Sequence, residues 1–83
     1  MTVHLHPHAR ERMVERGATE NEIIATVEGG EQFPVRFGRT GFRRNFTSEQ
    51  KWRDQFYRTK QLEVIAVADG DDWLVLTVIV RYF

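Results

Sequence analysis

The spacing of apolar residues changes at Gly29-Gly30, and this change constrains the fold more than any other feature of the chain. Before the glycine pair, apolar residues recur at helical spacing. After it, they tend to alternate with polar residues, as in strands. A chain of 83 residues has room for one domain with a thin core. We therefore expect a single α+β domain over residues 1–83, with two short N-terminal helices packed on one face of a four- to five-stranded, mainly antiparallel sheet.

Both helices have start and stop signals in the sequence. Pro7 suits the first turn of a helix and Gly17 suits the left-handed position after its end, which predicts a helix over residues 7–16. Thr19 and Glu22 form a capping-box pattern, and a glycine pair ends the second helix. Because only a few residues separate the two helices, we expect them to pack as a corner.

The rest of the chain predicts strands. They are expected at residues 32–37, 41–46, 52–58, 62–68 and 73–80. Pro34 places the first of them at an edge, since proline cannot donate a hydrogen bond to a neighbouring strand. Residues 47–50 are expected to form a loop, residues 59–60 a turn and residues 69–72 a hairpin turn. The last strand is apolar and β-branched throughout, which predicts the centre of the sheet.

Composition excludes several classes of function. Because the chain has no cysteine, disulfides, thiolate metal sites and thiol nucleophiles are ruled out. No window approaches 18 apolar residues, and the N-terminus lacks the apolar run of a signal peptide. We therefore expect a cytoplasmic protein that does not associate with membranes. Neither a glycine-rich phosphate loop nor a pair of catalytic carboxylates stands out.

Three side chains of the first helix form a cationic stripe. His8, Arg12 and Arg16 are spaced four residues apart, so they share one side of the helix. Like charges at this spacing repel, so helix stability does not explain them. In one interpretation the two arginines clamp a phosphate and His8 transfers a proton. In the other, the arginines pair with Glu15 or with a glutamate of the second helix such as Glu20, and His8 bonds to the sheet.

Charge is segregated along the chain, although the net charge is zero. Residues 34–60 hold eight basic residues against two acidic ones, together with six of the ten aromatic residues. Basic and aromatic residues that alternate in this way suit a polyanion with stackable bases, such as RNA. The candidate ligand-binding side chains of this segment are Arg43, Arg44, Trp52 and Tyr57. Arg81, near the chain end, is a further candidate. The alternative is a half-exposed sheet with arginines outward and aromatic residues inward.

Three other features allow two interpretations each. His4, His6 and His8 alternate and could face one side of an extended segment, as metal ligands do. Because no carboxylate or cysteine lies near them in the sequence and His8 is expected to be helical, we expect no metal and no cofactor. Thr77 is a single hydroxyl in an apolar strand, either bonded to a histidine or phosphate or merely compatible with the strand. Lys60 is either solvated or directed at a substrate.

A family of small bacterial domains of unknown function has the hallmark HAxxRMxxRG, which this chain resembles in His8-Ala9, Arg12-Met13 and Arg16-Gly17. Later parts are similar as well. Lys60 precedes a strand similar to the family's VEVI segment, and Thr77-Val78 resembles its closing strand. Ala18 departs from the family, in which Ile or Val commonly follows the glycine.

That family is similar in layout to the RelE, barnase and colicin-type ribonucleases, and several of its members look like toxins of toxin–antitoxin systems. The resemblance implies metal-independent cleavage of RNA, with His8, Arg12, Lys60 and Thr77 near the site and an antitoxin-like protein as a partner. Such chemistry needs a base, an acid and cations around the phosphate. The alternatives are a non-catalytic module that binds RNA or protein, and a homodimer formed through an exposed strand edge.

Overall fold

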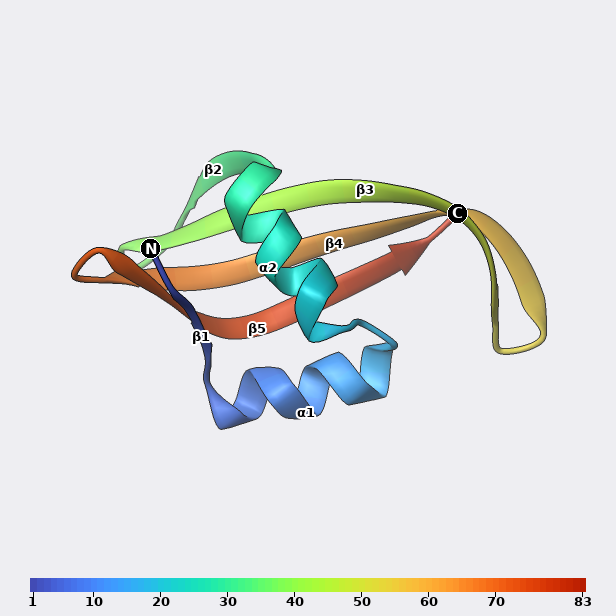
Figure 1. Ribbon diagram of the computed structural model, residues 1–83, viewed down its shortest axis with the longest axis horizontal. Coiled ribbons are helices and arrows are strands. Elements are labelled where there is room, and N and C mark those ends of the chain that lie inside the picture. Colours follow the sequence, from blue (N-terminus) through green and yellow to red (C-terminus); the bar gives the residue numbers. More distant parts are fainter.

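The computed structural model describes the backbone of residues 1–83 and all side chains except those of residues 48–50 and 52. The elements in chain order are β1 (Val3–Leu5), α1 (Pro7–Arg16), α2 (Glu20–Gly29), β2 (Glu31–Val35), β3 (Arg39–Trp52), β4 (Gln55–Asp69) and β5 (Asp72–Tyr82). The five strands form one sheet in the order β1-β5-β4-β3-β2. Helix α2 crosses the middle of this sheet and α1 lies along β5 (Figure 1). The predicted α+β class, with two helices and a five-stranded sheet, is confirmed.

The order and direction of the strands differ from the prediction. A strand, β1, precedes both helices and pairs parallel to β5, with Val3 opposite Trp73. The helices are therefore not N-terminal, and the sheet is mixed rather than mainly antiparallel. A strand of three residues that ends just before Pro7 is too short to show alternation, so sequence patterning missed it. β5 lies between β1 and β4, so the central strand is β4 and not the apolar β5.

The longest hairpin also differs from the prediction. Residues 47–50, expected as a loop, belong to β3, and β4 runs straight through residues 59–60, where a turn was expected. The chain reverses instead at Arg53-Asp54, where both residues have positive φ angles of 51° and 66°. A register shift within residues 47–50 marks a β-bulge. The hairpin extends past the end of β5 as a two-stranded arm (Figure 1). Polar residues without alternation do not distinguish such an exposed ribbon from a loop.

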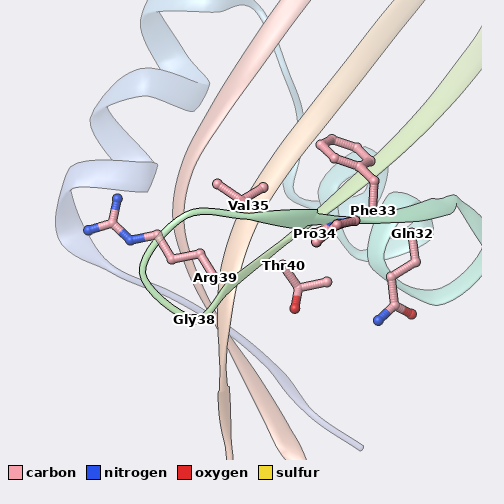
Figure 2. Close-up of a pocket in the computed structure, with 7 residues that line it drawn as sticks. All are labelled: Gln32, Phe33, Pro34, Val35, Gly38, Arg39 and Thr40. Atoms are coloured by element: carbon pink, nitrogen blue, oxygen red, sulfur yellow. The ribbon is translucent and has the colours of Figure 1, made fainter.

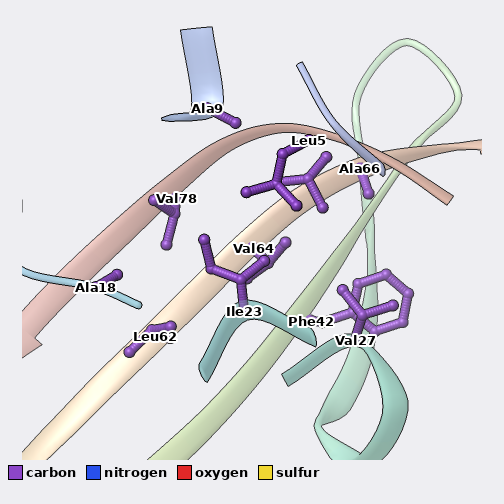
Figure 3. Close-up of a cluster of buried hydrophobic side chains, with 11 residues drawn as sticks. Leu5, Ala9, Ala18, Ile23, Val27, Phe42, Leu62, Val64, Ala66 and Val78 are labelled. Atoms are coloured by element: carbon purple, nitrogen blue, oxygen red, sulfur yellow. The ribbon is translucent and has the colours of Figure 1, made fainter. Parts of the chain in front are cut away.

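The core lies between the helices and the sheet. Its buried side chains come from both helices, the corner between them and four strands: Leu5, Ala9, Ala18, Ile23, Val27, Phe42, Leu62, Val64, Ala66, Val75 and Val78 (Figure 3). Ile23 is fully buried and points from α2 toward Val64 on β4. Burial of a side chain of this size stabilises a fold by about 1.5–3 kcal/mol. The capping box of Thr19 and Glu22 forms as predicted and holds the start of α2. Neither helix is long and apolar enough to cross a membrane.

A second bulge, in β5, changes which residues face the helices. Val75 and Val78 are both fully buried although they lie three residues apart. The ladder with β4 shifts between Ile65 and the next residue, which leaves Leu76 as an extra residue of β5. Thr77 lies opposite Ile65 and shares with it the face that the helices do not cover. Bulges redirect nearby side chains and occur often beside functional sites.

A glycine in β3 makes room for an aromatic side chain of the edge strand. The ring of Phe33 on β2 lies over Gly41, and a Cβ atom at Gly41 would clash with that ring. The guanidinium of Arg43 lies over the same ring, with Cζ 4.6 Å from its centroid. Phe33 is therefore held between a strand backbone and a cation, on the face of the sheet without helices.

Candidate functional site

A groove of about 340 Å³ opens beside the bulge in β5. The start of α1, the bulge and the start of β3 meet there, and the lining residues are His6, His8, Arg39, Leu76 and Thr77. The two histidines and Arg39 are exposed, whereas Thr77 is half-buried. Two imidazoles, a hydroxyl and a guanidinium in one groove form a site that can move a proton beside an anion.

His6 caps the N-terminus of α1. Its Nδ1 atom accepts a hydrogen bond from the backbone N–H of His8 at 3.1 Å. An accepting nitrogen carries no proton, so the neutral ring of His6 carries its proton on Nε2. The cap therefore sets both the orientation and the tautomer of this histidine, and it leaves Nε2–H as a donor.

His8 and Arg39 are two unpaired side chains of the groove. Neither makes a hydrogen bond or an ion pair with any side chain that the structure describes. The fold fixes the backbone of both residues, since His8 stands in the first turn of α1 and Arg39 begins β3 directly after a tight turn. An unpaired guanidinium beside an unpaired imidazole favours an anionic ligand that also exchanges a proton.

The remaining members of the cationic stripe have partners within the protein. Arg12 donates to Oε2 of Glu15 at 2.7 Å, which is one of the two pairings considered from the sequence. Arg16 donates to the backbone carbonyl of Val78 at 2.6 Å and so ties the end of α1 to β5. His8, by contrast, lines the groove at the other end of α1. The stripe therefore combines a candidate site residue, an arginine paired within its own helix and an arginine that holds the helix against β5.

Lys60 lies away from the groove and under the corner between the helices. It is 4 % exposed, and its Nζ donates to the carbonyl of Gly17 at 2.5 Å and to Oε1 of Glu22 at 2.8 Å. Lys60 pairs with Tyr82 across the sheet, and Tyr82 is five residues beyond Thr77 on β5, about 17 Å along a strand. The structure thus does not bring Lys60 to His8, and its contacts favour a structural role.

The arginines predicted to bind a ligand also have partners. Arg43 and Arg44 are neighbours on a strand, so they point to opposite faces of the sheet. On the face without helices, Oε1 of Glu63 lies 2.9 Å from Arg43 and 3.0 Å from Arg81. On the other face, Arg44 donates to the carbonyl of Ala25 in α2 at 3.0 Å. These three arginines are spread over two faces rather than gathered in one basic patch.

The two aromatic candidates lie on the long hairpin. The hydroxyl of Tyr57 donates to Gln55 at 3.0 Å, and its ring lies 5.5 Å from the ring of Tyr82. Burial, together with the charge of Glu22, raises the pKa of the Tyr82 hydroxyl. Trp52 lies outside the residues whose side chains the structure describes.

The three N-terminal histidines do not converge. His4 faces Asp72, with Nε2 3.4 Å from Oδ2, while the backbone N–H of Thr2 donates to Oδ1 of Asp72 at 2.8 Å. The hydrogen bond from Thr2 holds the pKa of Asp72 below its ordinary value, and His4 adds to this effect. Among the described residues, no three His, Asp or Glu side chains gather in a way that could hold a metal ion.

No family model, curated protein or solved structure matches this chain. The sequence groups His6 with His8 only in the metal-site interpretation, which is not favoured, and it does not predict Arg39 as a site residue. For His6 a local signal exists, because a residue just before a helix-starting proline occupies the N-cap position. For Arg39 there is none, since its approach to β5 depends on the order of the strands and on the turn before it.

Proposed function

We propose that this protein is a metal-independent endoribonuclease whose active groove is lined by His6, His8, Arg39 and Thr77. One observation carries the proposal. The unpaired imidazole of His8, the imidazole of His6 that caps α1 and the unpaired guanidinium of Arg39 share a groove of about 340 Å³. RNA contains its own nucleophile, the 2′-hydroxyl. A protein that cleaves RNA needs only to move protons and to stabilise negative charge on the phosphorus centre.

His8 is the general base of the proposed reaction. Its ring takes the proton of the 2′-hydroxyl, and the 2′-oxygen forms a bond to the adjacent phosphorus. The bond between phosphorus and the 5′-oxygen then breaks, and this oxygen takes a proton from water, which reaches the exposed groove. The hydroxide that remains takes the proton from His8 and restores the neutral base. The products are a 2′,3′-cyclic phosphate and a 5′-hydroxyl. A positioned base of this kind contributes about 10²- to 10⁴-fold to a rate.

The other side chains of the groove stabilise the charged phosphate. Arg39 offers two parallel N–H donors to the non-bridging oxygens. His6 donates from Nε2, the nitrogen that its capping role leaves protonated. Thr77 supplies a hydroxyl from the bulge of β5. Arg12 is paired with Glu15 and Lys60 with Glu22, so the proposal gives neither side chain a contact with the substrate.

The test is the chemistry of the products. A 5′-labelled single-stranded RNA is incubated with the wild-type protein in EDTA, and the fragments are separated and their ends identified. We expect fragments that end in a 2′,3′-cyclic phosphate, and no cleavage of the same sequence with 2′-O-methyl groups. Intact RNA, or fragments without the cyclic phosphate, would reject the proposal.

A second candidate function, a non-catalytic RNA-binding module, uses the same groove. The exposed and unpaired Arg39 favours it, because a phosphate ligand satisfies this cation whether or not cleavage follows. Salt-sensitive binding of the 2′-O-methyl RNA, with the unmodified RNA left intact, would select this candidate.

A further inference from the structure

The turn between β2 and β3 presents an aromatic side chain to solvent. Its tip is Phe37-Gly38, closed by a hydrogen bond from the N–H of Arg39 to the carbonyl of Arg36 at 3.4 Å. Phe37 is 88 % exposed and is the most exposed large apolar residue among those the structure describes. Its ring therefore contributes little to the core.

Phe37 also stands in a backbone conformation that its side chain disfavours. The φ angles of Phe37 and Gly38 are 64° and 70°. Turns with two such residues strongly favour Asn-Gly or Gly-Gly, and a bulky residue at the first position is a genuine outlier. Neither the conformational preference of the chain nor packing explains a phenylalanine here. Strained residues that give nothing to the core cluster at functional sites.

Two cations flank Phe37 in the sequence. Arg36 and Arg39 are exposed, and neither guanidinium has an ion pair or hydrogen bond among the side chains that the structure describes. Arg39 lines the groove with His8, and it also lines a second groove of about 540 Å³ along β2. Figure 2 shows its side chain leaving the turn in the direction of α1. An exposed ring, with one unpaired cation directly before it in the chain and another two residues after it, fits a ligand in which flat rings and negative charges alternate.

We infer that Phe37 is a stacking platform for the nucleobase next to the reacting phosphate, in single-stranded RNA held by Arg39. The inference rests on the proposed function for the identity of that phosphate, but the stacking itself can be measured without cleavage. It also explains why the strained residue is aromatic. Every nucleobase presents a flat face that can stack on an aromatic ring. Phe37 would therefore bind the strand without selecting a particular base.

Binding of a 2′-O-methyl oligonucleotide that cannot be cleaved tests the inference directly. Its affinity is measured by fluorescence anisotropy for the wild-type protein, Phe37→Trp and Phe37→Leu. We expect Phe37→Leu, which removes the aromatic face, to bind about 5- to 100-fold more weakly, the range for one stacked base. Phe37→Trp retains the affinity, and its added indole fluorescence is quenched on binding. The matched control is Phe56→Leu, another exposed phenylalanine, at 77 %, on the arm, where we expect no change.

A third variant separates a binding role from a structural one. Glycine adopts the left-handed conformation without strain, so Phe37→Gly is expected to raise the melting temperature while it weakens oligonucleotide binding. A structural phenylalanine would give the opposite shift in melting temperature. Loss of stability in Phe37→Gly together with unchanged binding in Phe37→Leu would overturn the inference.

The outcomes also separate this inference from the proposed function and from another ligand class. If binding depends on Phe37 while RNA stays intact, the stacking platform stands and the ribonuclease proposal fails. If RNA is cleaved and Phe37→Leu leaves KM unchanged, the ribonuclease stands and the platform fails. If the protein binds phosphatidylserine vesicles through Phe37 and does not bind the oligonucleotide, the turn contacts an anionic membrane surface and the inference is overturned.

Discussion

Replacing Lys60 tests whether the role of this lysine is to stabilise the fold through a buried ion pair, rather than to take part in catalysis. Nζ of Lys60 lies 2.8 Å from Glu22 and 2.5 Å from the carbonyl of Gly17, and the two charged side chains are only 5 % and 17 % exposed. Lys60→Met keeps most of the apolar stem and removes the ammonium group. The change leaves a half-buried carboxylate without its counter-ion and a backbone carbonyl without its donor.

The expected cost follows from these contacts. Removing one partner of a buried ion pair costs about 3–5 kcal/mol. Glu22 keeps hydrogen bonds from the backbone and hydroxyl of Thr19, so we expect the lower end, about 3 kcal/mol. For a domain of this size that loss lowers the melting temperature by about 12–24 °C. The double variant Lys60→Met/Glu22→Gln removes the orphaned charge and keeps the cap, so it should recover about 1–3 kcal/mol relative to the summed single effects.

Urea unfolding at pH 7, followed by circular dichroism, measures these free energies. The matched control is Lys51→Met, because Lys51 is 58 % exposed and 3.7 Å from Asp54. Removing such a surface pair should change the free energy of unfolding by less than about 1 kcal/mol. A Lys60→Met protein within about 1 kcal/mol of wild type, or single and double variants whose effects add, would refute the reasoning about this ion pair.

Two further predictions concern stability. Because the Thr2 hydrogen bond lowers the pKa of folded Asp72 below its unfolded value of about 3.9, this carboxylate stabilises the fold above that pH and stops doing so as the pH falls through the folded pKa. The difference in melting temperature between wild type and Asp72→Asn should therefore be largest near pH 6 and shrink toward pH 2; a difference independent of pH contradicts this. Gly41→Ala should lower the free energy of unfolding by about 1–3 kcal/mol, because its Cβ clashes with the ring of Phe33. Adding Phe33→Ala to the same chain should recover part of that loss. Equal stability of Gly41→Ala and the wild type would show that the ring moves aside freely.

Local chemistry explains where sequence patterning succeeded. The ends of α1 were predictable because Pro7 and Gly17 each suit one position of a helix, and α1 begins and ends where they indicate. The start of α2 was predictable because a threonine and a glutamate three residues apart satisfy two backbone N–H groups. The edge position of β2 followed from Pro34, which cannot donate to a neighbouring strand.

Features that depend on distant pairing were not predictable in this way. β1 is a strand only because it pairs with the edge of β5, and no local sequence pattern predicts the order of the strands. The bulge at Leu76 shifts Thr77 without a glycine or proline to mark it. The burial of Lys60 could not be predicted from its neighbours in the sequence, because it depends on the corner between the helices, which covers this lysine in the fold.

The candidate site shows the same division. The family resemblance implied one site with His8, Arg12, Lys60 and Thr77, and the structure places His8 and Thr77, but not the other two, in one groove. Arg39 completes the groove from a strand on the far side of β4, which no spacing in the sequence indicates. Several arginines predicted to bind a ligand instead pair with Glu63 or with helix carbonyls, since a strand directs neighbouring side chains to opposite faces.

The most direct test of the central claim compares the rates at which single-stranded RNA is cleaved in EDTA by three proteins. They are the wild type, His8→Ala and His4→Ala, the last a matched control because His4 faces Asp72 outside the groove. We expect His8→Ala to be slower by about 10²-fold or more, and His4→Ala to cleave like the wild type. Equal rates for the wild type and His8→Ala, or no cleavage by either, would contradict the account.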